Sequence, residues 1–210
     1  MIKPSTKEVD EMNVLILGAT GTLGSAARQE LLNQTEVNLT LFSRSADRLT
    51  VDPKREKAVS GDLTNGQELD AVMKGQDVVF AALSGNLKRY AQSIVESMDR
   101  NHVQRLIFIS SMGIYDEIPT SVGSRGNLKY NSVLRPYREA ADVIEASDLN
   151  YTVIRPGWFT GGPANYEVTH KGEPFGGHDV SINSIADLVL KLVNDNQLYS
   201  KESVGINTPA

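Results

Sequence analysis

The sequence contains no cysteine, and this absence excludes several kinds of chemistry at once. Without thiols there can be no disulfide framework, no thiolate metal site and no cysteine nucleophile. The chain has three histidines, scattered too widely to indicate paired metal ligands: His102, His170 and His178. We therefore expect no metal site, and we interpret each histidine as a surface or loop residue.

Positive charge and long apolar runs are also scarce. The formal net charge of −5 at pH 7 gives no overall attraction to nucleic acid or to anionic lipid. No apolar run is long enough to span a bilayer, and the N-terminal stretch MIKPSTKEVDE lacks the apolar core of a signal peptide. We expect a solvated tail over residues 1–11, a cytoplasmic location, and neither nucleic acid nor a membrane as partner.

The remaining composition is that of an ordinary globular protein. Hydrophobic residues make up 40% of the chain and charged residues 22%, close to typical soluble domains. A chain of 210 residues is also long enough to bury a substantial core. We expect one domain over residues 12–210, present as a monomer or a homodimer.

Short apolar runs alternate along the chain with stretches of helical period. The runs show little alternation, which is expected when both faces of a parallel strand are covered. They are Asn13 to Leu17, Val37 to Phe42, Asp77 to Leu83, Gln104 to Ser110 and Asn150 to Arg155, with a weaker candidate at Lys57 to Ser60. Amphipathic stripes typical of helices cover Leu23 to Leu31, Leu87 to Met98, Ala140 to Ile144 and Ile185 to Val193. The pattern predicts a Rossmann-like, doubly wound parallel sheet in a three-layer α/β/α arrangement.

The C-terminal third changes character. The segment from Pro156 to Gly177 is rich in glycine and proline, with few periodic apolar positions. We expect it to be an extended loop region with room for one short strand. In doubly wound sheets ligands bind outside the carboxyl ends of the strands, so residues 156–183 are predicted to lie on the substrate side. The alternative is a surface excursion without function.

The strongest local signal is VLILGATGTLGSAARQELL, in which an apolar strand runs through a glycine-rich turn into a helix. Gly18 can make the sharp turn, Gly21 lets the backbone approach a pyrophosphate, and Gly24 permits close packing of helix on strand. The N–H groups and the positive dipole end of the helix would then face the phosphates. The predicted dinucleotide-binding residues here are Gly18, Thr20, Gly21, Thr22, Leu23 and Gly24. The alternative is a glycine turn that merely packs.

The end of the second strand distinguishes between the two nicotinamide cofactors. An acidic residue there would accept from the ribose of NAD, whereas an arginine would pair with the 2′-phosphate of NADP. The segment LFSRS places Ser43 and Arg44 at this tip, with no carboxylate until Asp47. The sequence therefore favours NADP(H) over NAD(H), with Arg48 as a weaker second cation. Arg44 as a solvated arginine at a strand end is the alternative.

The spacing of the glycines and several further motifs indicate a family. GATGTLG, with LFSRS, GDLTN, AALSG, ISSMGIY and YTVIRPGWF over nearly the whole chain, resembles an atypical branch of the short-chain dehydrogenase/reductase superfamily. This branch has NmrA-like and NAD(P)H-binding, flavin- or biliverdin-reductase-like members. By this resemblance, Asp62 would accept from the adenine amino group and Leu63 would pack on the ring. The competing role for Asp62 is a helix N-cap.

Two further strand ends would contact the cofactor by the same resemblance. Small residues after the fourth strand would let ribose and adenine lie close to the backbone, and they include Ala82, Leu83 and Ser84; a tightly packed strand end is the alternative. The residues expected beside the nicotinamide are Pro156, Gly157 and Trp158. Proline and large rings suit a flat apolar wall for a ring-shaped substrate. Trp158 as a core anchor beneath the glycine-rich loop is the other interpretation.

The expected catalytic residues follow the fifth strand. ISSMGIY places Ser110 and Ser111 where the superfamily presents a serine toward substrate and nicotinamide, although serines at strand ends also cap loops. The superfamily's Tyr-x-x-x-Lys pair aligns with Leu134 and Arg138, and leucine cannot transfer a proton. Arg138 is still a candidate contact to ribose or phosphate.

A displaced hydroxyl is one way to replace the missing tyrosine. Tyr115 is our first candidate, with Tyr130 and Tyr137 nearby, and packing is the alternative role of each.

These patterns predict an NADP(H)-dependent oxidoreductase that transfers hydride to an aromatic or quinone- or flavin-like small molecule. The rival hypothesis is a non-catalytic regulatory protein that senses NADP(H), as some NmrA-like members do. An epimerase or dehydratase is less favoured, because such relatives usually retain the tyrosine and lysine.

Overall fold

The computed structural model describes residues 12–209, so the predicted tail lies outside the described part. One eight-stranded sheet runs through the molecule, in the spatial order β3-β2-β1-β4-β5-β6-β10-β8. Its strands are β1 (Asn13–Leu17), β2 (Asn38–Ser43), β3 (Glu56–Ser60), β4 (Val78–Ala81), β5 (Arg105–Ile109), β6 (Asn150–Pro156), β8 (Glu167–His170) and β10 (Glu202–Asn207). β8 runs antiparallel to β10, and the other neighbouring strands pair in parallel. β7 (Trp158–Thr160) and β9 (Asp179–Ser181) form a separate parallel pair.

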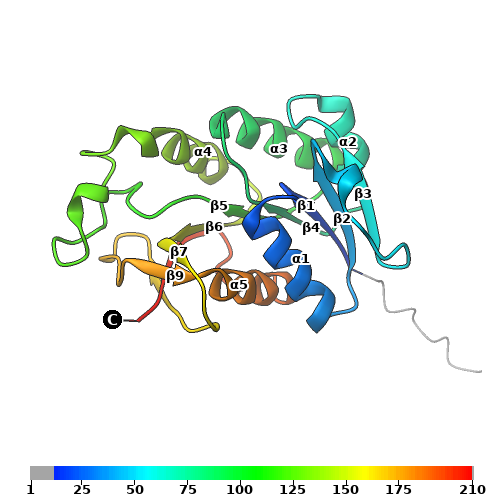
Figure 1. Ribbon diagram of the computed structural model, residues 1–210. Helices are drawn as coiled ribbons and strands as arrows, with labels where there is room; N and C mark the ends of the chain where they lie inside the picture. The colour runs from blue at the N-terminus through cyan, green and yellow to red at the C-terminus, as the bar shows by residue number, and fades with distance from the viewer. Residues whose placement is uncertain (1–11, 210) are drawn as a thin grey trace, which may run out of the picture.

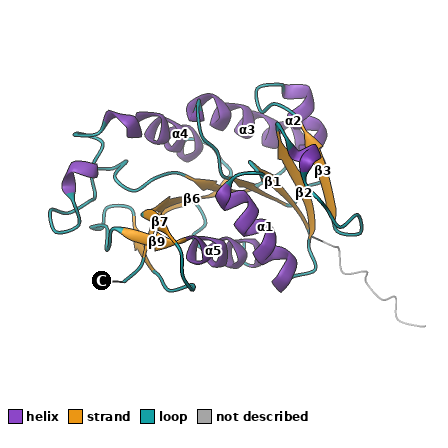
Figure 2. Cartoon of the chain, viewed as in Figure 1, coloured by secondary structure: helices purple, strands orange, loops and turns teal. Residues whose placement is uncertain are grey.

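Helices cover both faces of the large sheet (Figure 1 and Figure 2). On one face lie α1 (Thr22–Gln34) and α5 (Ile182–Asn194), and on the other lie α2 (Gly66–Met73), α3 (Leu87–Asn101) and α4 (Arg135–Glu145). Short 3-10 turns occur at η1 (Ala46–Arg48), η2 (Ser124–Gly126) and η3 (Ser132–Leu134). The predicted three-layer Rossmann-like fold is confirmed, and the six predicted strands differ from the observed bounds by at most two residues.

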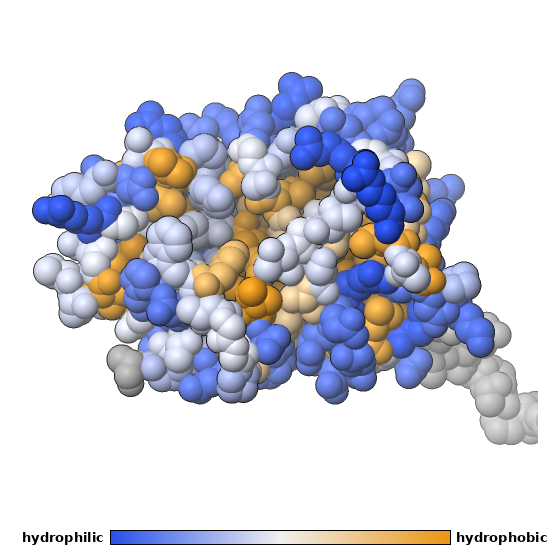
Figure 3. Space-filling model, viewed as in Figure 1, coloured by the Kyte–Doolittle hydropathy of each residue, from blue (hydrophilic) through white to orange (hydrophobic). Residues whose placement is uncertain are grey.

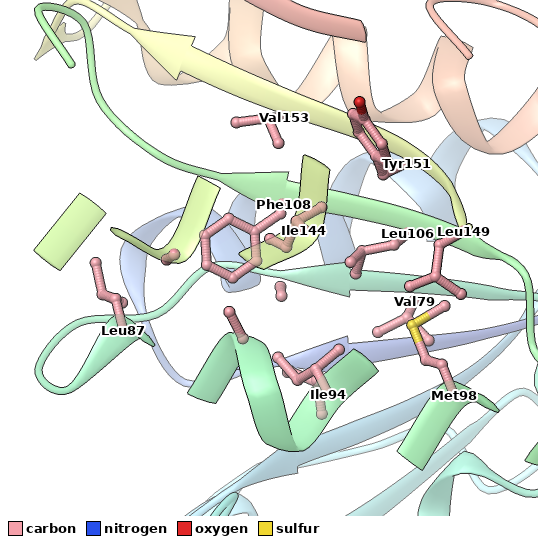
Figure 4. Close-up of a cluster of buried hydrophobic side chains, with 14 of the residues drawn as sticks. Val79, Leu87, Ile94, Met98, Leu106, Phe108, Ile144, Leu149, Tyr151 and Val153 are labelled. Carbon is pink, nitrogen blue, oxygen red and sulfur yellow. The ribbon is translucent and has the colours of Figure 1, made fainter. Parts of the chain in front are cut away.

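Each face of the sheet carries its own hydrophobic core. Figure 4 shows the core beneath α3 and α4, where Phe108 of β5 packs among side chains that include Ile94 of α3 and Ile144 of α4. The opposite core joins α1 and α5 to the other faces of the same strands. Strands that bury both faces need apolar residues at nearly every position, which explains the continuous runs in the sequence.

The C-terminal third holds more strands than the sequence indicated. The single short strand expected between Pro156 and Gly177 is replaced by two, β7 and β8, and the unassigned segment ESVGIN forms β10 inside the sheet. Gly205 in β10 leaves room for its neighbours, since a Cβ there would lie 2.4 Å from Thr169 Oγ1 and 2.7 Å from the Phe175 ring. Strands of three or four residues are too short to show a period. β10 was not predicted because its serine and glycine interrupt the apolar run.

The order of the strands creates a crevice. β1 pairs with β2 on one side and with β4 on the other, so the chain changes its direction of winding between them. In open α/β sheets ligands bind at such a switch point, outside the carboxyl ends of the strands. On the face of the molecule that Figure 3 shows, hydrophobic residues gather near the middle and hydrophilic residues surround them. Across residues 12–209, no helix combines the length and apolar character needed to cross a membrane.

Candidate functional site

The glycine turn between β1 and α1 is held close to the neighbouring strands. Gly18 has φ +87°, a conformation that favours glycine, and its N–H donates to the Phe42 carbonyl at 2.9 Å. A Cβ on Gly18 would lie 2.2 Å from the Ala82 carbonyl oxygen, and a Cβ on Gly24 would lie 2.2 Å from the Gly18 carbonyl oxygen. Backbone atoms cannot yield as a flexible side chain can, so both positions require glycine.

Gly21 differs from Gly18 and Gly24 because the space around a Cβ built on it is mostly open. The one heavy atom within 4 Å of a Cβ built there is the Gly18 carbonyl oxygen, at 3.3 Å. Gly21 is also the N-cap of α1, and within the described chain no side chain caps this helix and no acidic residue lies in its first turn. The free N–H groups and the positive end of the helix dipole are therefore available to an anion.

A cleft of about 320 Å³ opens beside this turn. Its walls come from the ends of β1, β2, β3 and β4 and from α3. Ten predicted cofactor residues line it: Gly18, Thr20, Gly21, Ser43, Arg44, Asp62, Leu63, Ala82, Leu83 and Ser84. Thr22, Leu23 and Gly24 begin α1 next to it, with Leu23 turned into the core. The volume is at the lower end of the range for small-molecule sites.

The tip of β2 presents a cation without a competing carboxylate. Arg44 is exposed and lines the cleft, and Thr20 donates to Ser43 Oγ at 3.2 Å, which links the glycine turn to this tip. The nearest acidic residue along the chain, Asp47, accepts from Ser60 Oγ at 2.8 Å. At this tip, the Arg44 guanidinium is therefore the charged group that can pair with a phosphate.

Asp62 is held ready to accept a hydrogen bond. Its Oδ1 accepts from the N–H and the hydroxyl of Thr64, both at 2.8 Å. These two bonds lower the pKa of Asp62, and the charges of Arg44 and Arg89 contribute further. The carboxylate is thus ionised at neutral pH, with Oδ2 available to a donor. The alternative N-cap role is wrong, because Asn65 caps α2 by accepting from the N–H groups of residues 67 and 68.

Sequence reasoning missed four residues that line this cleft: Phe42, Ser45, Gly61 and Tyr90. Phe42 and Gly61 lie at the ends of β2 and β3, and Tyr90 comes from α3. Tyr90 belongs to the amphipathic stripe of α3. The helical period therefore indicated a residue that packs against the core and gave no sign that Tyr90 also lines the cleft. Gly61 leaves space for Phe42, since a Cβ there would lie 2.6 Å from the ring. The glycine that follows β3 in GDLTN was the available signal.

The serines after β5 lie outside the lining of this cleft. Ser110 is buried, its N–H donates to the Ile154 carbonyl at 2.7 Å, and its hydroxyl donates to the Tyr137 carbonyl at 3.4 Å. Ser111 is partly exposed and its hydroxyl donates to the Met112 carbonyl at 3.1 Å. Ser111 is therefore the more accessible of the two hydroxyl groups.

The predicted replacement for the missing tyrosine faces elsewhere. The Tyr115 hydroxyl donates to Glu145 Oε1 at 2.5 Å and lies 3.3 Å from Ser203 Oγ. Burial, with the hydrogen bond to Glu145, raises the pKa of Tyr115. A hydroxyl engaged in this way is poorly suited to deliver a proton to a ligand, so we leave Tyr115 out of the proposed catalytic set.

The positions of the missing pair are also occupied by structural contacts. Leu134 is buried and lies against Gly113. Arg138 donates from Nε to Asp142 Oδ1 at 2.7 Å and from Nη1 to the Ile114 carbonyl at 3.3 Å. Its guanidinium therefore contacts groups of α4 and of the loop after β5, and Arg138 does not line the cleft.

The residues after β6 border a second hollow, of about 570 Å³. Gly157 donates to the Ile206 carbonyl at 3.1 Å and, with Pro156, is buried. Trp158 is 65% exposed and Phe159 is 49% exposed, so the interpretation of Trp158 as a core anchor is wrong. The predicted substrate-side region, residues 156–183, supplies most of the lining of this hollow.

The fold and the cleft together define a dinucleotide-binding protein. The amide-lined start of α1 fits a pyrophosphate, the β2 tip fits a ribose phosphate, and Asp62 fits an adenine amino group. Residues 18–196 match the sequence pattern of a family described as NAD(P)H-binding. The chain belongs to this NAD(P)H-binding family.

One solved relative supports this assignment, and two more distant solved structures share the fold. A Rossmann-fold NAD(P)-binding family protein from Shigella flexneri is 36% identical, with a TM-score of 0.82 over 95% of this chain and 94% of that one. A short-chain dehydrogenase/reductase from Veillonella parvula, solved in complex with NADP, is 24% identical, with a TM-score of 0.86 over 95% of both chains. ChuY, an anaerobilin reductase from Escherichia coli O157:H7, is 18% identical, with a TM-score of 0.79 over 94% of this chain and 98% of that one.

A curated relative carries a different description. It is YhfK of Bacillus subtilis (strain 168), described as an uncharacterized sugar epimerase, and it is 27% identical over 75% of this chain and 77% of its own length. The family match confirms the NAD(P)H-binding part of the predicted resemblance, and the solved structures confirm its fold.

Proposed function

We propose that the protein is an NADP(H)-dependent reductase that transfers hydride to an aromatic, quinone-like or flavin-like small molecule. The observation that carries the proposal is the pairing of an open, uncapped α1 N-terminus with Arg44 at the neighbouring strand tip. The first suits the pyrophosphate that both nicotinamide cofactors share, and the second suits the 2′-phosphate that only NADP has. The cofactor supplies the hydride when it is bound.

In that proposal, the residues of this chain bind the cofactor and orient the substrate. The first-turn N–H groups of α1 hold the pyrophosphate, Arg44 and Ser43 hold the 2′-phosphate, and Asp62 accepts from the adenine amino group. In the proposal, Ser111 donates a hydrogen bond to an oxygen on which charge develops. Trp158, exposed after β6, offers a flat face to an aromatic substrate.

Turnover is tested by following NADPH oxidation with a panel of quinones, flavins and aromatic carbonyls. We expect oxidation with at least one flat acceptor, and a reduction of roughly tenfold or more in kcat/KM for Ser111→Ala, the scale of one lost donor to a developing charge. Ser147→Ala is the matched control, because Ser147 is also partly exposed and donates to a main-chain carbonyl, but it follows α4 and not β5. Absence of oxidation across the whole panel contradicts the reductase proposal.

A second candidate is a regulatory protein that binds NADP(H) without turnover. Leu134 and Arg138 favour it, because neither position supplies the proton donor that the wider superfamily uses there. Tight NADPH binding, no oxidation with any acceptor, and a partner whose affinity changes between NADP⁺ and NADPH would support this candidate. A sugar epimerase is not favoured, since that chemistry also uses a proton-transferring residue.

A further inference from the structure

His178 lies in a more specific position than a loop histidine requires. Its carbonyl accepts from the Trp158 N–H at 2.8 Å, just before β9 pairs with β7. The two rings are stacked, with centroids 6.1 Å apart and planes 15° apart. The backbone bond and the ring contact hold the imidazole beside the aromatic residue that directly follows β6.

A carboxylate orients the same imidazole. Nδ1 of His178 lies 2.5 Å from Oδ1 of Asp179. A hydrogen bond at one ring nitrogen selects the tautomer, so the proton of the neutral ring sits on Nδ1. Nε2 is then the nitrogen that can exchange a proton with a ligand. When the ring is protonated, the second N–H is on Nε2. Across residues 12–209, Asp179 is the charged group bonded to this ring and Trp158 is its aromatic neighbour.

The pair borders the second hollow described above. His178 and Asp179 line the hollow of about 570 Å³, together with Thr160 and with Val122 from the loop after β5. Both side chains of the pair are more than half exposed, so a ligand can reach the imidazole. Since β7 follows β6 almost directly, the hollow adjoins the carboxyl edge of the sheet, where substrates of doubly wound folds bind.

The reaction proposed above lacks a proton donor at the positions the superfamily uses. Leu134 has no transferable proton, and the Tyr115 hydroxyl is bound to Glu145. Reduction of a carbonyl or quinone by hydride needs a proton on the oxygen that becomes negative. Histidine is the side chain most often used for such transfer at neutral pH.

We propose that His178 is the proton donor of this reductase, with Asp179 as its positioning residue. The inference rests on the proposed function. NADPH gives its hydride to the acceptor and becomes NADP⁺, and the electron pair of the reduced C=O bond moves to oxygen. That oxygen takes the proton from Nε2 of His178, which is reprotonated by solvent.

The first test measures the ring pair without cofactor or turnover. Trp158 is the only tryptophan of the chain, so its fluorescence reports the stacked imidazole directly. We expect the emission at constant pH to differ between the parent and His178→Gln, because the stacked imidazole is removed. His170→Gln is the matched control, because His170 has the same arrangement with Nδ1 2.6 Å from Glu202 Oε2 but lies on β8. The same emission in His178→Gln as in the parent contradicts the contact on which the proposal depends.

The second test measures reduction of 1,4-naphthoquinone by NADPH across pH 5.5–9. We expect His178→Gln to lower kcat by roughly 10²-fold, the lower end for a lost general acid, with unchanged NADPH affinity. Asp179→Asn should reduce kcat less and alter the pH profile, whereas His170→Gln should match the parent. Full activity in His178→Gln, with a parent that turns over, overturns the donor role alone. A parent that oxidises no NADPH with any acceptor contradicts the reductase and the donor role together.

Discussion

Glycines at the turn after β1 show how single residues position the cleft. Backbone atoms 2.2 Å from a Cβ require glycine at positions 18 and 24, whereas a Cβ on Gly21 would meet only the Gly18 carbonyl oxygen, at 3.3 Å. The sequence motif predicted the need for glycine at Gly18 and Gly24 because that need depends on local chain geometry. It could not choose between alternatives that depend on distant neighbours, such as the N-cap role of Asp62, the burial of Trp158 or the partner of Tyr115.

At the same scale, Gly24→Ala should destabilise the fold. The added methyl meets the Gly18 carbonyl oxygen at 2.2 Å, and overpacking of this kind costs about 1–3 kcal/mol. Urea unfolding of the parent and the variant measures this loss. Gly161→Ala is the control, because a Cβ there has no heavy atom within 4 Å, and its unfolding midpoint should stay close to that of the parent. Equal stability of Gly24→Ala and the parent contradicts the close approach of α1 to the turn.

A buried ion pair makes a second residue-scale prediction. Arg155 is 0% exposed and donates to Glu117, which is also buried at its side chain. Glu117→Gln leaves the guanidinium without its charge partner, so we expect a loss of about 3–5 kcal/mol in unfolding free energy. In the exposed pair of Lys88 with Glu139, Glu139→Gln should cost less than about 1 kcal/mol. Similar losses for both variants would contradict the assigned burial.

Elements were predictable where they are long and periodic. Helices α1, α3, α4 and α5 and the six strands from β1 to β6 follow directly from apolar period, because each buries a wide face. The strands β7, β8, β9 and β10 depend on tertiary pairing, since Ser, Gly and Asn within them have little intrinsic strand preference. The substrate-side hollow is built from these elements, so its geometry required the structure.

The contact between α2 and α3 predicts a pH-dependent stability. Asp70 of α2 accepts from Arg100 of α3 at 3.0 Å and from Ser97 at 2.5 Å. These bonds, chiefly that from Arg100, lower the pKa of Asp70 below its ordinary 3.8. A carboxyl whose pKa is lower in the folded state stabilises that state above its unfolded pKa, and this stabilisation is lost as pH falls through the folded pKa.

Thermal unfolding at pH 7 and at pH 3 measures this dependence. We expect Asp70→Asn to lower the Tm at pH 7, with a difference from the parent that shrinks at pH 3, where the parent begins to lose its own contribution. Asp99→Asn on α3 is the control and should show no such convergence. A Tm difference that stays constant over the range would contradict the role of ionised Asp70.

At the scale of the whole molecule, the winding of the sheet decides where a ligand can bind. The reversal between β1 and β4 opens the cleft beside α1, and the segment after β6 forms a second hollow at the same edge. The sequence predicted the first, because motif and topology coincide there. The second combines loops far apart in the chain, and the stacking of His178 with Trp158 is visible only in the folded structure.

The most direct test of the account is calorimetric titration of NADPH and of NADH, at fixed ionic strength, against the parent and Arg44→Ala. We predict that the parent prefers NADPH and that Arg44→Ala loses about 1.5–3 kcal/mol of NADPH binding, the scale of a hydrogen bond to a charged group, while NADH affinity is unchanged. Arg48→Ala, a neighbouring arginine outside the cleft lining, should keep most of the preference. Equal affinity of the parent for both cofactors, or no binding of either, would contradict the account.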